Sequence, residues 1–200
     1  MAFAAVIAAY QDAEDGDDRL RALLPMAGRT LLEHQVRRAI RAGASHVVIL
    51  VERIPAALNA ALDRLKRDKL PVEIARDPSD AASRLHPSED VLLVADGLVA
   101  SHACFERMAA SEAPSLLVVE DVREHEDFER IDAQWRWAGL ALTDPDTMRE
   151  TAAMVGDWDI QSTLLRRIVQ RGPRYLTMGD AEALGGAAER ITLADRSAST

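Results

Sequence analysis

Short apolar runs alternate with amphipathic segments between residues 1 and 120 of the chain. The runs are rich in alanine, valine, isoleucine and leucine and lack alternating polar positions. This pattern is typical of strands that are buried on both faces in a parallel sheet. It predicts five strands, at 3–8, 46–51, 72–75, 91–95 and 115–119.

Segments with apolar residues at helical spacing lie between these runs. Thr30 and Glu33 form a capping box, which predicts the start of a helix. Pro55 can open a second helix, Ser101 can cap another, and residues 80–85 predict a short helical turn. Because strands and helices alternate, we expect an α/β fold with three layers, in which helices cover both faces of a mostly parallel central sheet.

The pattern changes after residue 120. It predicts a charged loop at 120–127 and then two strands or one bent ribbon at 131–133 and 135–142. Two helices should follow, one after Asp144 and one after Asp159, and then a last strand at 174–178. No linker long enough to divide the chain is visible. We therefore expect a single domain over 1–195 and a frayed tail at 196–200.

Composition narrows the classes of partner. The chain has 200 residues, enough to bury a core, and a formal net charge of -9, which argues against nucleic acid and anionic membranes as partners. Its single cysteine, Cys104, excludes an internal disulfide and suits a reducing compartment. No apolar run approaches the ~20 residues needed to span a bilayer, and the apolar start lacks the basic region of a signal peptide. We expect a cytoplasmic protein.

Asp96 is the candidate residue for chemistry. It follows the apolar run at 91–94 and precedes Gly97. A carboxylate just past the carboxyl end of a buried strand lies where open α/β sheets bind their ligands, and it can hold a divalent cation that in turn holds phosphates. The alternative interpretation is that Asp96 and Gly97 only form a turn after the strand.

The segment after the first strand is unusually acidic. Residues 10–18 carry five carboxylates and no basic side chain, namely Asp12, Glu14, Asp15, Asp17 and Asp18. Arg19 and Arg21 follow them. A solvated acidic loop is the simplest interpretation of this segment.

Two stretches resemble the nucleotidyltransferases of the GT-A type, which include sugar-phosphate nucleotidylyltransferases, alditol-phosphate cytidylyltransferases and the molybdenum-cofactor guanylyltransferase. The first stretch is Ala-Val-Ile-Ala-Ala at 5–9 followed by Leu-Leu-Pro-Met-Ala-Gly-Arg-Thr-Leu-Leu-Glu-His at 23–34, and the second is 91–97. In outline the resemblance covers residues 2–190. It implies a GT-A fold and transfer of a nucleotidyl group from an NTP to a phosphorylated sugar or alditol.

The resemblance also implies site residues. The metal-binding aspartate of the family, which holds Mg²⁺, carries over to Asp96, and contacts to the nucleotide carry over to Ala8, Ala9 and Gly97 as well as to Asp96. The family arginine matches Arg19. The catalytic candidates are therefore Arg19 and Arg21, which would face the phosphates. A second metal carboxylate is left open between Asp159, Asp180 and none.

The phosphate loop departs from the family pattern, which is a glycine-rich turn, then an arginine, then a proline-lysine pair. Tyr10 stands at the place of the first loop glycine, Gly16 is the only glycine in the loop, and Leu20 with Arg21 replaces proline-lysine. The family's glycines let backbone N–H groups close on the triphosphate. A carboxylate ~4 Å from a phosphate charge costs about 1 kcal/mol even in water. Five carboxylates there predict weak NTP binding.

Three hypotheses follow. The chain is an active nucleotidyltransferase that needs Mg²⁺, an NTP and a phosphorylated sugar or alditol. Alternatively, it is a domain of the same fold without the chemistry, a pseudoenzyme that serves as a binding or regulatory partner of another protein. The third hypothesis is a glycosyltransferase-like protein that uses Asp96 with a sugar nucleotide. The sequence does not identify the base or the acceptor.

Overall fold

A computed structural model of the chain describes residues 2–14, 19–155, 159–177 and 192–194. Its centre is a seven-stranded sheet in the order β10-β8-β9-β6-β1-β4-β5. In chain order the strands are β1 (Phe3–Ala8), β4 (Val47–Leu50), β5 (Val72–Ala75), β6 (Asp90–Val94), β8 (Ser115–Glu120), β9 (Trp135–Thr143) and β10 (Arg174–Thr177). The five strands predicted in the first 120 residues are all present, with ends that differ by one residue at most.

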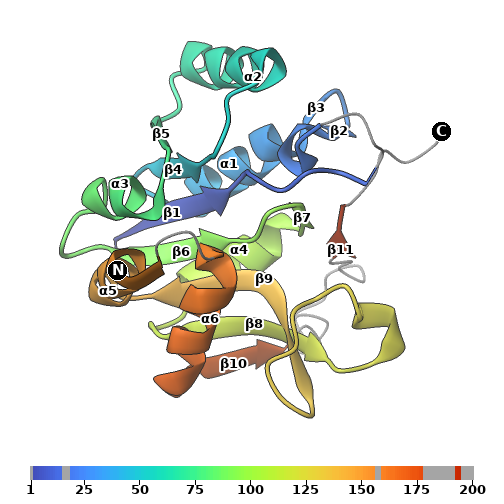
Figure 1. Cartoon of the computed structure of the whole chain (residues 1–200), viewed down its shortest axis with the longest axis vertical. Coiled ribbons are helices and arrows are strands. Elements are labelled where there is room, and N and C mark those ends of the chain that lie inside the picture. Colours follow the sequence, from blue (N-terminus) through green and yellow to red (C-terminus); the bar gives the residue numbers. More distant parts are fainter. Residues whose placement is uncertain (1, 15–18, 156–158, 178–191, 195–200) are drawn as a thin grey trace.

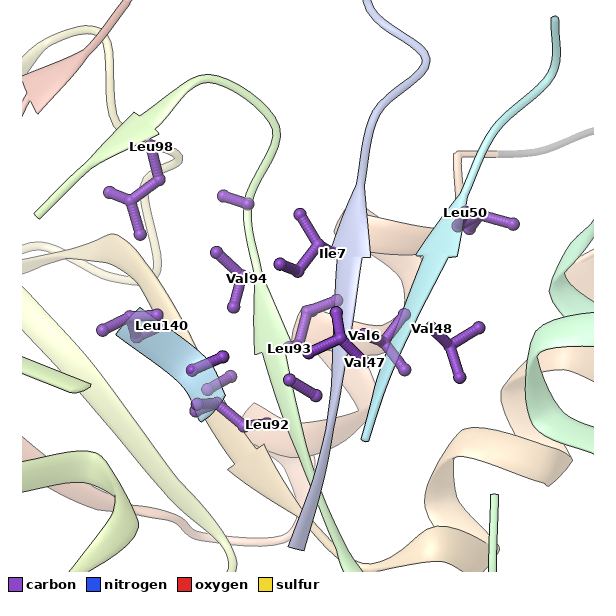
Figure 2. Close-up of a cluster of buried hydrophobic side chains, with 14 of the residues drawn as sticks. Val6, Ile7, Val47, Val48, Leu50, Leu92, Leu93, Val94, Leu98 and Leu140 are labelled. Carbon is purple, nitrogen blue, oxygen red and sulfur yellow. The ribbon is translucent and has the colours of Figure 1, made fainter. Parts of the chain in front are cut away.

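Four of the six strand pairs in this sheet are parallel, and only β9 runs antiparallel to its neighbours β6 and β8. β1 lies between β4 and β6, with Ala5 opposite Leu92 and Ile7 opposite Val94. Figure 2 shows the apolar side chains of these three strands packed beside one another. Because β1 and β6 are parallel neighbours, the loops that follow them leave the sheet at the same edge.

Helices cover both faces of the sheet (Figure 1). α1 (Leu31–Arg41) contacts α2 (Ala56–Arg67) and α4 (His102–Ala109) in one layer. α3 (Pro78–Ser83), α5 (Pro145–Val155) and α6 (Ile160–Gln170) form the other, with α5 between its two neighbours. The predicted three-layer α/β/α fold with a mostly parallel sheet is therefore confirmed.

The predicted capping box begins α1. The Thr30 hydroxyl accepts the backbone N–H of Glu33 at 3.3 Å, and the Glu33 carboxylate accepts the backbone N–H of Thr30 at 2.9 Å. Glu33 is buried, and Arg64 of α2 donates to both of its carboxylate oxygens at 2.9 Å. The same carboxylate thus caps α1 and joins α1 to α2.

Two predicted elements differ in the structure. Residues 131–133 are not a strand, because the Asp132 carboxylate accepts the backbone N–H groups of Gln134 and Trp135, which closes a turn before β9. The helical turn predicted at 80–85 begins earlier, as α3, because Asp77 caps it by accepting the N–H of Asp80 at 2.8 Å. Met178, predicted to end the last strand, and the predicted tail at 196–200 lie outside the described residues.

Several short elements were not predicted. β2 (Pro25–Met26) pairs with β3 (Arg29–Thr30), and β7 (Leu98–Val99) pairs with β11 (Thr192–Leu193), both antiparallel. Two 3₁₀ turns, η1 (Arg21–Leu23) and η2 (Arg123–His125), complete the described elements. Of the helices in the described part of the chain, none has the length and apolar character to cross a membrane.

Candidate functional site

The loops after β1 and β6 meet at Asp96, directly beyond the carboxyl ends of the two strands. Asp96 is 2% exposed, and its Oδ2 atom accepts the backbone N–H groups of Tyr10 and Gln11, both at 2.7 Å. The preceding N–H, that of Ala9, donates to the Leu50 carbonyl at 2.9 Å. The N–H groups of Tyr10 and Gln11 are thus the first two after β1 that do not bond within the sheet, and both donate to a carboxylate of the same chain.

A cavity of about 150 Å³ opens beside Asp96. Its lining combines four carboxylates, one guanidinium, two aromatic side chains and small or polar residues: Gln11, Arg21, Ala95, Asp96, Asp127, Phe128, Glu129, Trp137, Gly139, Asp159, Gln161, Ser162 and Leu193. We call this cavity the cleft. Gln11 and Asp96 both line it, as the pairing of β1 with β6 predicts.

The acidic loop does not supply the cleft's carboxylates in the described part of the chain. The loop folds back as a hairpin, in which Ala13 N–H donates to the Arg19 carbonyl at 2.7 Å and Arg21 N–H to the Gln11 carbonyl at 2.9 Å. Asp12 forms an ion pair with Arg53, which is not a lining residue. Glu14 is exposed and does not line the cleft, and residues 15–18 lie outside the described residues.

The structure brings some of the predicted site residues together and separates others. Arg21 lines the cleft with Asp96, and its guanidinium donates to the Gln11 side chain at 3.1 Å. Arg19 is exposed on the hairpin and does not line the cleft. Ala8 and Ala9 are buried in the core below it.

Gly97 is buried next to Asp96 and has a positive φ of 75°. A Cβ atom added at this position would lie 2.9 Å from the Ala194 carbonyl oxygen and 3.2 Å from Cδ of Arg21. Both the backbone conformation and the close approach of a second chain segment therefore require glycine. This is a packing reason for Gly97 and is independent of any ligand.

Asp159, a candidate for the second metal carboxylate, lies across the cleft and already accepts hydrogen bonds from other residues. It caps α6 by accepting the N–H of Gln161 at 3.0 Å, and it accepts the Tyr10 hydroxyl at 2.6 Å. Ser162 is within hydrogen-bond distance of both Asp159, at 3.0 Å, and Glu129, at 2.9 Å. Tyr10 therefore reaches from Asp96, through its N–H, to Asp159, through its hydroxyl. Asp180, the other candidate, lies outside the described residues.

The burial of Asp96 perturbs its ionisation. Burial raises the pKa of this carboxyl to about 6, although the N–H groups of Gln11 and Tyr10 favour the charged form and oppose the rise. Burial also raises the pKa of the Tyr10 hydroxyl, and its hydrogen bond to Asp159 adds to the rise. Asp96 Oδ1 and Trp137 Nε1 are both buried without a hydrogen-bond partner among the described residues.

The described residues do not contain a group of three or more His, Cys, Asp or Glu side chains arranged to hold a metal ion. Mg²⁺ usually needs only one or two carboxylates, because water and substrate phosphates complete its shell. The unpartnered Oδ1 atom of Asp96 fits that role as a single protein ligand. The other oxygen, Oδ2, is occupied by two N–H groups.

Several cleft residues were missed by sequence reasoning. Asp127 and Glu129 lie in or beside the charged loop before β9, where nothing in the pattern separates cleft residues from solvated ones. Gln161 is buried in α6, and its side-chain oxygen accepts the backbone N–H of Asp96 at 2.9 Å. A single glutamine on an amphipathic helix gives no local signal for such a contact.

Two solved structures share the fold of this chain. A nucleotidyl transferase from Methanothermobacter thermautotroptrophicus superimposes with a TM-score of 0.58 and 18% identity, over 87% of this chain and 85% of that one. A UDP-glucose pyrophosphorylase in complex with UDP-glucose gives a TM-score of 0.61 and 12% identity, over 86% and 88%. No protein-family model and no curated protein sequence matches the chain.

Proposed function

We propose that this chain is a nucleotidyltransferase-fold domain that does not transfer nucleotides and that serves as a binding or regulatory partner of another protein. One observation carries the proposal: the Asp96 carboxylate accepts the Tyr10 and Gln11 N–H groups at 2.7 Å. In the GT-A family that the sequence resembles, the backbone N–H groups after the first strand close on the triphosphate. Here those donors already have a buried, charged acceptor.

Exchange of that acceptor for a phosphate is unfavourable. A phosphate that took the two N–H groups would leave the Asp96 carboxylate, which is 2% exposed, without these partners. Hydrogen bonds to charged groups contribute about 1.5–3 kcal/mol each, and a buried charge left unpaired costs at least as much. The native contact therefore competes directly with a phosphate.

The charge of the cleft opposes phosphates as well. Asp96, Asp127, Glu129 and Asp159 line it, against a single guanidinium, that of Arg21, among the described lining residues. Each pair of like charges 4 Å apart costs about 1 kcal/mol in water and more where the dielectric constant is lower. The negative lining supports the prediction of weak NTP binding, and the described hairpin carboxylates, Asp12 and Glu14, are not part of that lining.

A second candidate function is Mg²⁺-dependent transfer of a nucleotidyl group from an NTP to a phosphorylated sugar or alditol. The unpartnered Asp96 Oδ1 atom in the cleft wall favours it. When bound there, Mg²⁺ would supply positive charge that offsets the charge of the phosphates. Arg21, which lines the same cleft, would then contact the phosphates, as the resemblance implies.

Calorimetric titration with CTP, GTP, UTP and ATP in the presence of Mg²⁺ tests the proposal. We expect no binding of these NTPs at the cleft of the wild type, so any heat that the wild type gives should be unchanged in Asp96→Asn. The double variant Asp127→Asn, Glu129→Gln removes two of the cleft's negative charges and should bind weakly. Asp63→Asn, a neutralised exposed carboxylate on α2, is the matched control and should behave as the wild type.

Micromolar binding by the wild type that Asp96→Asn removes would contradict the inactive domain and support the Mg²⁺-dependent enzyme. Release of pyrophosphate by the wild type in the presence of phosphorylated sugars or alditols would have the same meaning.

A further inference from the structure

A second cavity, of about 230 Å³, lies between the start of α1 and the end of α2. Its charged lining consists of Arg29, Glu33, Arg37, Arg64, Arg67 and Asp68. It shares no lining residue with the cleft. We call it the arginine cavity.

The arginine cavity carries an excess of positive charge in a chain whose formal net charge is -9. Its two carboxylates are both engaged: Glu33 accepts two hydrogen bonds from Arg64, at 2.9 Å each, and Asp68 forms an ion pair with Arg37. The guanidinium groups of Arg29 and Arg67 form no ion pair with any described residue. Two of the four arginines are therefore not neutralised within the part of the chain that the structure describes.

The charges of the cavity favour an anion. Arg64 and Arg37 are paired with Glu33 and Asp68, so the excess positive charge is that of the exposed guanidinium groups of Arg29 and Arg67. Like charges that line one cavity repel each other, and an anion bound between them relieves that repulsion.

We propose that the arginine cavity binds the phosphate group of a small molecule. Guanidinium is a planar fork of donors that matches the oxygens of a phosphate or carboxylate. A phosphate carries about −1.5 to −2 charges near neutral pH, which matches the two guanidinium groups without ion pairs, whereas a carboxylate carries one. The inference does not depend on the proposed function, because none of the residues that line the arginine cavity lines the cleft.

Titration calorimetry with inorganic phosphate and with pyrophosphate, in the absence of Mg²⁺, tests the proposal. The wild type should bind both anions saturably, and pyrophosphate more tightly, because it offers oxygens to both Arg29 and Arg67. Arg29→Gln and Arg67→Gln should each weaken binding roughly tenfold, since each removes charge-assisted donors. Both side chains are exposed, so the variants should fold as the wild type does, which their melting curves check.

Arg41→Gln is the matched control. Arg41 lies exposed in the last turn of α1 and does not line the cavity, so this variant changes the net charge equally and should bind as the wild type does. Absence of saturable binding by the wild type would overturn the proposal. So would an equal loss of affinity in Arg41→Gln, because that result would show a diffuse effect of charge rather than a site.

Discussion

Replacement of Asp96 by asparagine should stabilise the protein at alkaline pH. Asparagine keeps a carbonyl oxygen that can accept the N–H groups of Tyr10 and Gln11, and it removes the buried charge. Burial raises the pKa of Asp96 to about 6 in the folded protein, from an ordinary value of 3.8. The ionised carboxylate is therefore less favourable in the folded protein than in the unfolded chain.

The magnitude follows from these two pKa values. Their difference of about 2 corresponds to about 3 kcal/mol at about 1.4 kcal/mol per pKa unit. Between pH 4 and pH 6 the folded protein binds more protons at this site than the unfolded chain does, so this site's contribution to stability rises as the pH falls. Above about pH 6 the full cost of the charge is present. Allowing for relaxation around the new amide, we expect a gain of about 2 kcal/mol at pH 8.

Urea unfolding of wild type and Asp96→Asn at about pH 8 and about pH 4 measures this difference. The variant should have the larger free energy of unfolding at the higher pH, and the difference should disappear at the lower pH. Asp63→Asn, an exposed position on α2, should show neither effect. An Asp96→Asn variant that is less stable than the wild type at pH 8 would refute the reasoning, because the hydrogen bonds to the carboxylate would then outweigh its desolvation.

Three further predictions concern the surroundings of the cleft and the start of α1. Gly97→Ala should lower the free energy of unfolding by about 2 kcal/mol, measured in urea, because its Cβ would lie 2.9 Å from the Ala194 carbonyl oxygen at a φ of 75°; an unchanged midpoint would contradict this. Tyr10→Phe should cost about 1 kcal/mol through loss of the 2.6 Å hydrogen bond to Asp159. Because the pKa of Tyr10 is raised, wild type and Tyr10→Phe should show the same phenolate absorbance at about pH 10, and any phenolate signal there should come from Tyr175, the other tyrosine. Burial would raise the pKa of Glu33, but its hydrogen bonds lower that pKa to about 2. Glu33→Gln should therefore destabilise the protein by about 2 kcal/mol at pH 7, and by progressively less as the pH falls from about 4.5 toward 2.

The sequence predicted the sheet well because its strands are buried on both faces. Continuous apolar runs such as 91–94 are typical of strands that are covered on both faces, so they predict a central sheet between two layers of helices. The capping box of Thr30 and Glu33 was equally visible, since its two hydrogen bonds lie within one helical turn. These features arise from residues that are close together in the sequence, so a local sequence pattern predicts them.

The candidate site was predicted only in part. The position of Asp96 follows from strand order, but its contacts with Tyr10, Gln11 and Gln161 join segments more than sixty residues apart. The two-residue strands β7 and β11 are also too short to give a periodic pattern, and they form only because the two segments meet. Likewise, that Asp127 and Glu129 line the cleft beside Asp96 and Asp159, whereas Asp12 and Glu14 of the hairpin do not, depends on tertiary contacts.

The central claim is that Asp96 holds the Tyr10 and Gln11 N–H groups and so denies them to a nucleotide. Backbone amide NMR measures these two groups directly. When Mg²⁺ and each of the four common NTPs are added at millimolar concentration to the ¹⁵N-labelled wild type, the amide signals of Tyr10 and Gln11 should not shift and should remain protected from hydrogen exchange. Saturable shifts of these two signals at micromolar NTP would contradict the account.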